Sequence, residues 1–335
     1  MPTSIGENIP LKKVPPRGVK VIFLNTANAT AATLDGGFTQ AAQALGWKPT
    51  IVTYSATDPG AAVQSAIDQG YKYIASASIS LSQITPQVPE LKAHHVAFFE
   101  AYTADVPGFK SNGLYGEAQN PKGAGVEGKL MADYITVNSA QKANVLFVSL
   151  PIYPVLVEQG AAAQTELAKN CPTCTFTVLP ISVSQLVAGQ TPSLIVSYLQ
   201  THPTTNYLYY SFNGMDTGVY PALQTANLTN QVKIVGTQGE YPELEGILNG
   251  QQSAWTMVPE NYVMWVVVDW MARQSVGELN MKAENLDNAG VNYLVSTPRL
   301  AGITIGLLSG NHGVWGGPTN YQHSFKVLWT VKKKK

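Results

Sequence analysis

Apolar segments alternate along the chain with helix-like segments, and the first such unit sets the pattern. Val19–Leu24 is apolar except for Lys20, which is typical of a strand buried on both faces of a parallel sheet. After a polar loop, apolar residues recur at helical spacing through LDGGFTQAAQALGW, with Thr33 and Asp35 as expected N-caps. The loop thus follows the carboxyl end of the strand, where open α/β sheets bind their ligands.

The same alternation continues to about residue 100. It predicts strands at Thr50–Tyr54, Tyr71–Ala77 and Val96–Glu100, separated by helices at Pro59–Gln69 and Ile84–Ala93. Strands that alternate with helices in this way predict a parallel sheet with right-handed crossovers.

The pattern then begins again. Ala143–Leu150 is similar to the first strand, and Leu156–Lys169 is similar to the first helix. The rest of the second set is predicted as strands and helices at Thr175–Leu179, Ser193–Thr201, Asn206–Phe212, Pro221–Ala226 and Val232–Thr237. The sequence therefore predicts two similar α/β halves in tandem.

Some segments lie outside this repeat. Tyr115–Ala118 and a helix at Lys129–Thr136 join the halves, and a long helix, Glu260–Gly277, exceeds the second half's set of elements. Its apolar positions favour packing against a domain surface, so we expect the chain to return to the first half there. A second crossing is expected near Asn292–Pro298.

Composition narrows the class of protein. The 335 residues suffice for two domains, and 45% apolar residues can fill two cores. A net charge of zero, with 13% charged residues, gives no field that would attract nucleic acid or an anionic membrane. No apolar run approaches the roughly 20 residues that span a bilayer. Met1–Pro10 has no hydrophobic signal core, so we expect either a cytosolic protein or a mature form that has lost its leader; the low charge favours export.

Two motifs suggest chemistry but lack its context. Gly123, Gly125 and Gly128 match GxGxxG, yet Asn120-Pro121-Lys122 precedes them and no acidic residue follows at the spacing of a dinucleotide site. We expect a glycine-rich turn before a helix. Cys171 and Cys174 have the spacing of a redox pair but follow a helix instead of opening one, which favours a surface disulfide in an exported protein.

No pattern of catalytic residues stands out. The sequence contains no HExxH, GxSxG or P-loop motif, and its five histidines are not grouped with the cysteines as in a zinc site. We therefore expect no enzymatic activity, no metal and no cofactor.

Several segments carry a resemblance to a known family. They are GFTQAAQALGW, AVQSAIDQGYKYIASAS, GKLMADYI, EQGAAAQTEL and IVGTQG. With them the chain resembles the type I periplasmic binding proteins of the sugar-binding cluster, the solute receptors of ABC importers, over roughly residues 18–297. The segments PLKKVPPRG and YQHSFKVLW look like an actinobacterial, Gram-positive branch of that family.

The resemblance implies an α/β fold of two Rossmann-like lobes with parallel sheets, joined by a three-strand hinge. One lobe would comprise residues 1–116 and 259–292, and the other residues 117–258 and 293–335. Such proteins close their lobes over a small solute and deliver it to an ABC transporter permease. The resemblance further implies a monomer that binds no nucleic acid and lies outside the cytoplasm, as a periplasmic protein or a cell-surface lipoprotein.

The resemblance also implies a set of solute contacts at strand ends. By position these are Asn28, Thr30, Ser78, Glu100, Tyr102, Tyr153, Asn213, Gln238, Met257 and Glu260. The chain departs from the family at three places. Thr30 and Ala31 replace sugar-stacking aromatics, the arginine expected beside Glu100 is missing, and Gln238 replaces an aspartate.

The side chains in this set favour an uncharged solute. Carboxylate and amide groups can pair with vicinal hydroxyls, and tyrosines offer flat faces with polar tips. Without arginine or lysine, phosphate and carboxylate ligands are disfavoured, so we expect a neutral sugar or polyol. Tyr102, Tyr153, Phe212 and Met257 leave open an aromatic or mostly apolar solute. A ligand-sensing regulator and a cytoplasmic α/β enzyme are further alternatives, although residues 1–18 are too short for a helix-turn-helix.

Overall fold

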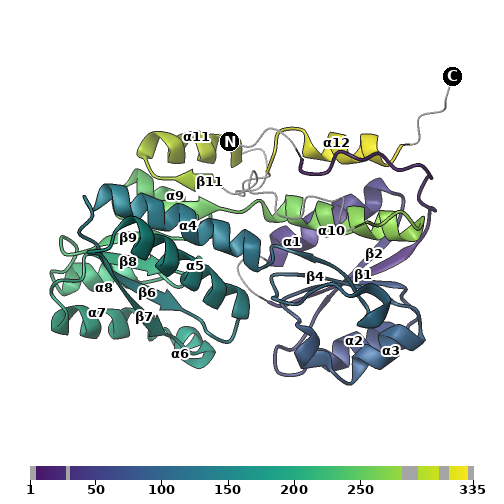
Figure 1. Ribbon diagram of the computed structural model, residues 1–335, viewed down its shortest axis with the longest axis horizontal. Coiled ribbons are helices and arrows are strands. Elements are labelled where there is room, and N and C mark those ends of the chain that lie inside the picture. The colour runs from purple at the N-terminus through teal and green to yellow at the C-terminus, as the bar shows by residue number, and fades with distance from the viewer. Residues whose placement is uncertain (1–4, 28–30, 281–292, 309–316, 331–335) are drawn as a thin grey trace. The chain divides into compact units, whose positions relative to one another are not determined.

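The chain divides into two compact units. The computed structural model describes residues 5–27, 31–280, 293–308 and 317–330. The first unit comprises residues 1–120, 259–291 and 316–335, and the second comprises residues 121–258 and 292–315. Each unit contains its own sheet with helices on both faces (Figure 1).

The first unit is built on a parallel five-stranded sheet in the order β2-β1-β3-β4-β5. The strands are β1 (Lys20–Asn25), β2 (Lys48–Thr53), β3 (Tyr73–Ala77), β4 (Ala97–Ala101) and β5 (Leu114–Ala118). The register between β4 and β5 shifts at Phe98/Phe99, where Tyr115 is the additional residue. This bulge makes Glu117 the neighbour of Glu100.

Helices cover both faces of this sheet. They are α1 (Ala31–Ala44), α2 (Pro59–Asp68), α3 (Gln87–Ala93), α10 (Glu260–Ser275) and α12 (Tyr321–Leu328), with short 3₁₀ turns η1 (Leu81–Ile84) and η2 (Phe109–Ser111). One core joins β1, β3, β4 and β5 to α2 and α3. On the opposite face, Phe38 of α1 stacks on Phe23, and α10 contacts β4 and β5.

The second unit is built on a six-stranded sheet in the order β11-β10-β9-β8-β6-β7. The strands are β6 (Asn144–Ser149), β7 (Thr175–Pro180), β8 (Tyr207–Tyr210), β9 (Lys233–Gly236), β10 (Ala254–Met257) and β11 (Tyr293–Val295). All neighbours are parallel except β10 and β11.

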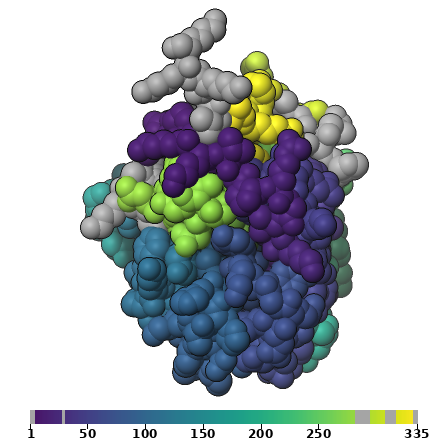
Figure 2. Space-filling model, turned by 90° about the vertical axis from the view of Figure 1, so that its right-hand side faces the viewer, coloured from purple at the N-terminus to yellow at the C-terminus, as the bar shows by residue number. Residues whose placement is uncertain are grey.

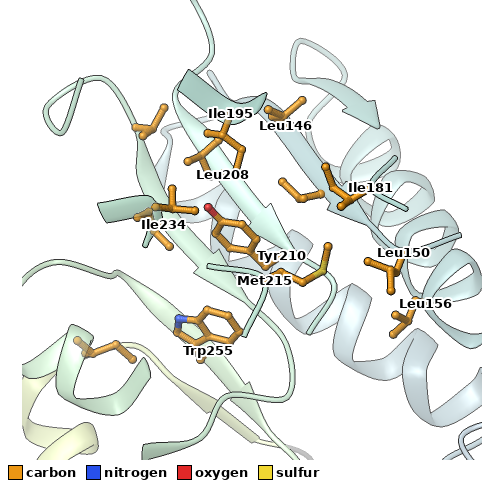
Figure 3. Packing of buried hydrophobic residues seen from close by; sticks show 14 of the residues in the cluster. Leu146, Leu150, Leu156, Ile181, Ile195, Leu208, Tyr210, Met215, Ile234 and Trp255 are labelled. Atoms are coloured by element: carbon orange, nitrogen blue, oxygen red, sulfur yellow. The ribbon is translucent and has the colours of Figure 1, made fainter. Parts of the chain in front are cut away.

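The helices of the second unit form two layers. They are α4 (Pro121–Asn138), α5 (Pro154–Asn170), α6 (Val183–Val187), α7 (Thr191–Thr201), α8 (Val219–Thr225), α9 (Tyr241–Leu248) and α11 (Pro298–Leu308). Leu146 and Val148 of β6 belong to a core that α7, α8 and α9 close. Figure 3 shows Leu146 in this core with Leu208 and Ile195. The adjacent β6 residues Val145 and Phe147 point into the other core, beneath α4 and α5, because strand side chains alternate between faces.

The C-terminal segment differs from its predicted position. The sequence analysis assigned residues 293–335 to the second lobe, whereas residues 316–335 belong to the first unit. The reason is aromatic packing: Phe325 and Trp329 lie against Trp265 of α10. The N-terminal segment lies at the same place, where Leu11 donates to the carbonyl oxygen of Leu328, and Figure 2 shows its purple atoms beside the yellow C-terminal ones.

The glycine-rich motif is also not the turn that was predicted. The helix α4 begins at Pro121, so Gly123, Gly125 and Gly128 all lie within it. A Cβ on Gly128 would overlap the carbonyl oxygen of Gln159 in α5. The glycines therefore permit close packing of two helices.

The predicted helix Ile84–Ala93 was likewise wrong in part. The segment forms η1 and then α3, which begins only at Gln87 because Pro86 precedes it. Thr33 and Asp35 do not cap α1 either, since this helix already includes Ala31. Asp35 instead accepts a hydrogen bond from the Asn25 side chain at 2.9 Å.

Cys171 and Cys174 form a disulfide between the end of α5 and the start of β7, with their Cα atoms 5.4 Å apart. Within the described residues, no helix combines the length and hydrophobicity that crossing a membrane requires.

Candidate functional site

The carboxyl edge of the first sheet carries buried polar side chains. Asn25, at the end of β1, is 1% exposed and donates to Asp35 and, at 3.3 Å, to the carbonyl oxygen of Ala31. Ser76, Glu100 and Glu117 lie in register on β3, β4 and β5. Because residues in register on parallel strands share a face, these three side chains form one polar row above the apolar core.

Unusual backbone conformations follow these strands. Ser78, Tyr102 and Gln119 directly follow the last residues of β3, β4 and β5, with φ of 62°, 65° and 53°. These are left-handed conformations that residues other than glycine adopt at a cost of about 1 kcal/mol or more. Backbone bonds retain them, since the amides of Ser78 and Tyr102 donate at 2.9 Å to carbonyl oxygens of the neighbouring strand. Such strain concentrates at functional sites.

Glu100 and Glu117 form a buried acidic pair. Glu100 is fully buried and accepts a hydrogen bond from the Thr103 hydroxyl at 2.7 Å, and Glu117 accepts one from the Thr103 amide at 3.1 Å. Burial, and then the charge of Asp105, raises the pKa of Glu100 well above its ordinary value. Burial likewise raises the pKa of Glu117, although the Thr103 amide opposes the shift. Both shifts favour the protonated form of the pair, and in that form the pair can donate as well as accept.

The raised pKa values predict a pH-dependent effect of Glu100→Gln. The folded protein holds protons that the unfolded chain releases above pH 4.5, so the free energy of unfolding falls as pH rises through that range. Glutamine does not titrate, so Glu100→Gln removes the part of this fall in stability that Glu100 causes. At pH 8 we expect the Tm of Glu100→Gln to lie a few degrees above that of the unmodified protein, as a gain of about 1 kcal/mol in the free energy of unfolding would give. At pH 4.5 we expect no gain in Tm. Calorimetry measures both Tm values. Glu158→Gln, at an exposed position of α5, is the control, and a gain of equal size at both pH values for Glu100→Gln would contradict the explanation.

The second sheet presents its predicted residues along one edge. Tyr153, Asn213, Gln238 and Met257 lie at or just beyond the ends of β6, β8, β9 and β10, which are successive strands of the sheet. Asn213 is 4% exposed and Met257 is 1% exposed, whereas Tyr153 and Gln238 are half-buried. Gln238 has a left-handed φ of 57°. This edge therefore repeats the two features of the first sheet, buried polar groups and unfavourable backbone conformations.

Hydrogen bonds hold the backbone around Gln238. Its amide donates at 3.3 Å to the Thr256 hydroxyl, which in turn donates at 3.0 Å to the buried carboxylate of Glu127 in α4. On the other side, the Thr237 hydroxyl donates at 2.8 Å to the carbonyl oxygen of Ser211. The end of β9 is thus fixed by both neighbouring strands.

The remaining predicted positions have different outcomes. Asn28 and Thr30 lie outside the described residues. Glu260 begins α10 and is 5% exposed, and it belongs to the first unit. The sequence analysis missed Asn25, Thr103, Glu117 and Glu127. An acidic residue at the end of Tyr115–Ala118 was a visible signal for Glu117, but only the bulge places it beside Glu100.

Charge at these edges is limited to carboxyl groups. Among the described residues, none at or directly after the carboxyl end of a strand is lysine or arginine. The described residues also include no group of three or more histidine, cysteine, aspartate or glutamate side chains arranged to hold a metal ion. The edges can therefore offer hydroxyl, amide and carboxyl groups to a ligand.

A family profile described as "Periplasmic binding protein domain" matches residues 19–279, which is most of the chain. The chain belongs to the periplasmic binding protein family. The family match confirms the predicted type of fold, two α/β units with mostly parallel sheets.

Solved structures of other periplasmic binding proteins have the same fold. A 5-methylthioribose transporter solute-binding protein from Thermotoga lettingae TMO, in complex with 5-methylthioribose, has a TM-score of 0.74 at 15% identity, over 94% of this chain and 99% of that one. A sugar ABC transporter protein from Yersinia enterocolitica has a TM-score of 0.71 at 18% identity, over 95% of this chain and 98% of that one. An ABC transporter solute-binding protein from Burkholderia graminis C4D1M, in complex with D-arabinose, has a TM-score of 0.71 at 16% identity, over 84% of this chain and 96% of that one.

No curated protein sequence matches the chain.

Proposed function

We propose that this periplasmic binding protein is the solute receptor of an ABC importer, and that it binds a neutral sugar or polyol. The observation that carries the proposal is the composition of the two sheet edges, which present buried amide, hydroxyl and carboxyl groups and, among described residues, no lysine or arginine. A phosphorylated or carboxylated solute would ordinarily meet a cationic donor.

The chemistry of these groups suits vicinal hydroxyls. Burial raises the pKa of both Glu100 and Glu117 and so favours a protonated pair, which can accept one hydroxyl hydrogen and donate to another oxygen. The Asn213 and Gln238 side chains each combine a donor and an acceptor, which matches a sugar hydroxyl that must do both. Structures with 5-methylthioribose and D-arabinose in proteins of the same fold support this class of solute.

We further propose that both edges contact one solute and that the solute acts by shifting an equilibrium. Contacts that form only when both units touch the solute favour the closed form, in proportion to its differential affinity. Glu100 would serve from the first unit and Asn213 from the second. Ser78, Tyr102, Tyr153, Met257 and Glu260 complete the proposed contacts, and no bond of the solute is made or broken.

The proposed location is outside the cytoplasm, either in a periplasm or on the cell surface. The disulfide between Cys171 and Cys174 supports it, because disulfides persist in oxidising compartments. The proposed partner is a membrane permease that receives the closed form.

A thermal-shift screen tests the solute class. The panel contains D-ribose, D-arabinose, D-allose and myo-inositol, together with indole and phenol as aromatic solutes. A solute present at about 1,000 times its Kd adds roughly 4 kcal/mol to the free energy of unfolding, so a true solute raises Tm clearly. If only indole or phenol raised the Tm, the sugar or polyol class would be wrong and an aromatic or mostly apolar solute would replace it.

A substitution tests the assigned position. Asn213→Ala is expected to weaken binding of the stabilising sugar by about tenfold or more, because a buried hydrogen-bonding group is lost. Titration calorimetry measures the Kd. Asn230→Ala, an exposed residue in the loop before β9 at the opposite end of the sheet, is the matched control and leaves the Kd unchanged. Equal effects of the two substitutions would remove Asn213 from the site.

A further inference from the structure

A chain of buried and half-buried polar groups lies below the proposed solute-binding edge of the second unit. The Gln252 side chain donates to the carboxyl group of Asp216 at 2.6 Å, and its oxygen accepts the indole N–H of Trp255. Glu243, which is 3% exposed, accepts the backbone amide of Glu240 at 2.7 Å. None of these side chains was proposed above as a solute contact.

Trp255 forms the support for the loop that carries Gln238. A Cβ on Gly236 would collide with the Trp255 ring, and a Cβ on Gly239 would lie only 2.8 Å from the Trp255 Cβ. The other side of the indole is parallel to Tyr210 of β8, with ring centroids 6.3 Å apart (Figure 3). Movement of Trp255 would therefore displace the backbone on both sides of Gln238.

Glu240 connects the same loop to Asn213. Burial raises the pKa of Glu240, and a hydrogen bond from the Asn213 side chain opposes that shift. Asp216 stands three residues after Asn213 in the loop that follows β8. The two acidic groups, Asp216 and Glu243, thus hold the two loops that present Asn213 and Gln238.

The charges around this pair are almost all negative. Burial, and next the charge of Asp216, raises the pKa of Glu243 to about 7, and Glu240 adds to the shift. Burial also raises the pKa of Asp216, and Tyr210 faces it from β8 with a raised pKa of its own.

Among the residues that the structure describes, the neighbouring elements supply no compensating cation. Strand β10 has no charged residue, and the one charged residue of α11, which packs on α9, is the exposed Arg299. Lys233 is at the far end of β9, and Tyr241 and Glu245 of α9 are exposed.

We propose that Asp216 and Glu243 are positioning residues for the second unit's part of the solute site, through the hydrogen bonds that they make to Gln252 and to the Glu240 amide, and that a proton held by this pair keeps the loops of Asn213 and Gln238 in place. This inference rests on the proposed function. While the pair holds its proton, it carries a single negative charge that Gln252 and the Glu240 amide stabilise. Loss of the proton buries a second charge beside Glu240, and the repulsion loosens both loops.

The first experiment follows the loops without any sugar. The indole N–H resonance of Trp255, assigned by its absence in Trp255→Phe, and the backbone amide resonances of Asn213 and Gln238 are recorded from pH 5.5 to 8.5. We expect all three to titrate with a common midpoint near pH 7. The titration disappears in Glu243→Gln and in Asp216→Asn but persists in Glu245→Gln, an exposed control on the same helix.

The second experiment measures sugar affinity over the same pH range, with D-ribose, D-arabinose and D-allose as probes. The Kd is expected to rise about tenfold between pH 6 and pH 8.5 in the unmodified protein and in Glu245→Gln, and to stay constant in Glu243→Gln. A merely structural role for Glu243 would weaken binding equally at every pH.

The two experiments fail in different ways. If no probe binds while the resonances titrate together, the proposed solute class is wrong and the coupling of the loops to the proton stands. If Glu243→Gln retains the midpoint, or if its Kd changes with pH as in the unmodified protein, the positioning role is overturned. Asp216→Asn provides the same comparison should Glu243→Gln not fold.

Discussion

Gly128→Ala is expected to lower the free energy of unfolding of the second unit by about 3 kcal/mol. The added methyl group would overlap the carbonyl oxygen of Gln159 and lie 3.1 Å from the backbone nitrogen of Ala163. Both atoms belong to the backbone of α5, so no rotamer change can make room, and α4 must separate from α5. Urea unfolding followed by circular dichroism measures the loss.

Gly125→Ala is the matched control in the same helix. A Cβ at Gly125 would meet only the Cβ of Ala162, at an ordinary 3.6 Å. Since alanine favours helix by up to about 1 kcal/mol over glycine, this variant should be as stable as the unmodified protein or more so. If both substitutions had the same effect, the close contact of α4 and α5 would not explain the glycines.

The strands and most helices were predictable because their patterns are local. The apolar run that begins at Val21 forms β1, and the repeat of the pattern after Ala143 forms the second sheet. The unpredicted helices α9 and α11 pack on each other, so their stability comes from a partner far along the chain. The same holds for α12, whose place was mispredicted because its aromatic residues pack on Trp265.

The candidate site was predictable only to the level of strand ends. Parallel strands bring their carboxyl ends to one edge, so Ser78 and Tyr102, and likewise Asn213 and Gln238, could be grouped before any coordinates. The sequence could not show the register shift that places Glu117 beside Glu100, because it depends on pairing between strands. Nor could it show left-handed backbone at residues that are not glycine.

The buried ion pair of α10 leads to the second large prediction. Arg273 donates to Asp269 at 2.6 Å, and both side chains are at most 3% exposed. Arg273 also donates at 2.9 Å to the carbonyl oxygen of Ile9, and the indole N–H of Trp329 donates to Asp269 at 2.6 Å. This network joins the N-terminal segment and the C-terminal helix to α10.

Arg273→Met is therefore expected to cost the first unit about 3–5 kcal/mol, because it leaves the Asp269 carboxylate buried without its cation. Burial already raises the pKa of Asp269 despite Arg273, so removing the cation raises it further. The loss of stability should then be largest at high pH, where the carboxylate must ionise. The double variant Asp269→Leu/Arg273→Met removes this pair but leaves Glu7, whose carboxylate lies 3.7 Å from Arg273, so it should recover only part of the loss. Lys92→Met, at an exposed position of α3, should change little. Urea unfolding at pH 5 and pH 8 measures the free energy of unfolding of each variant. A loss below about 1 kcal/mol for Arg273→Met would show that water reaches Asp269 and that this network does not hold the terminal segments on α10.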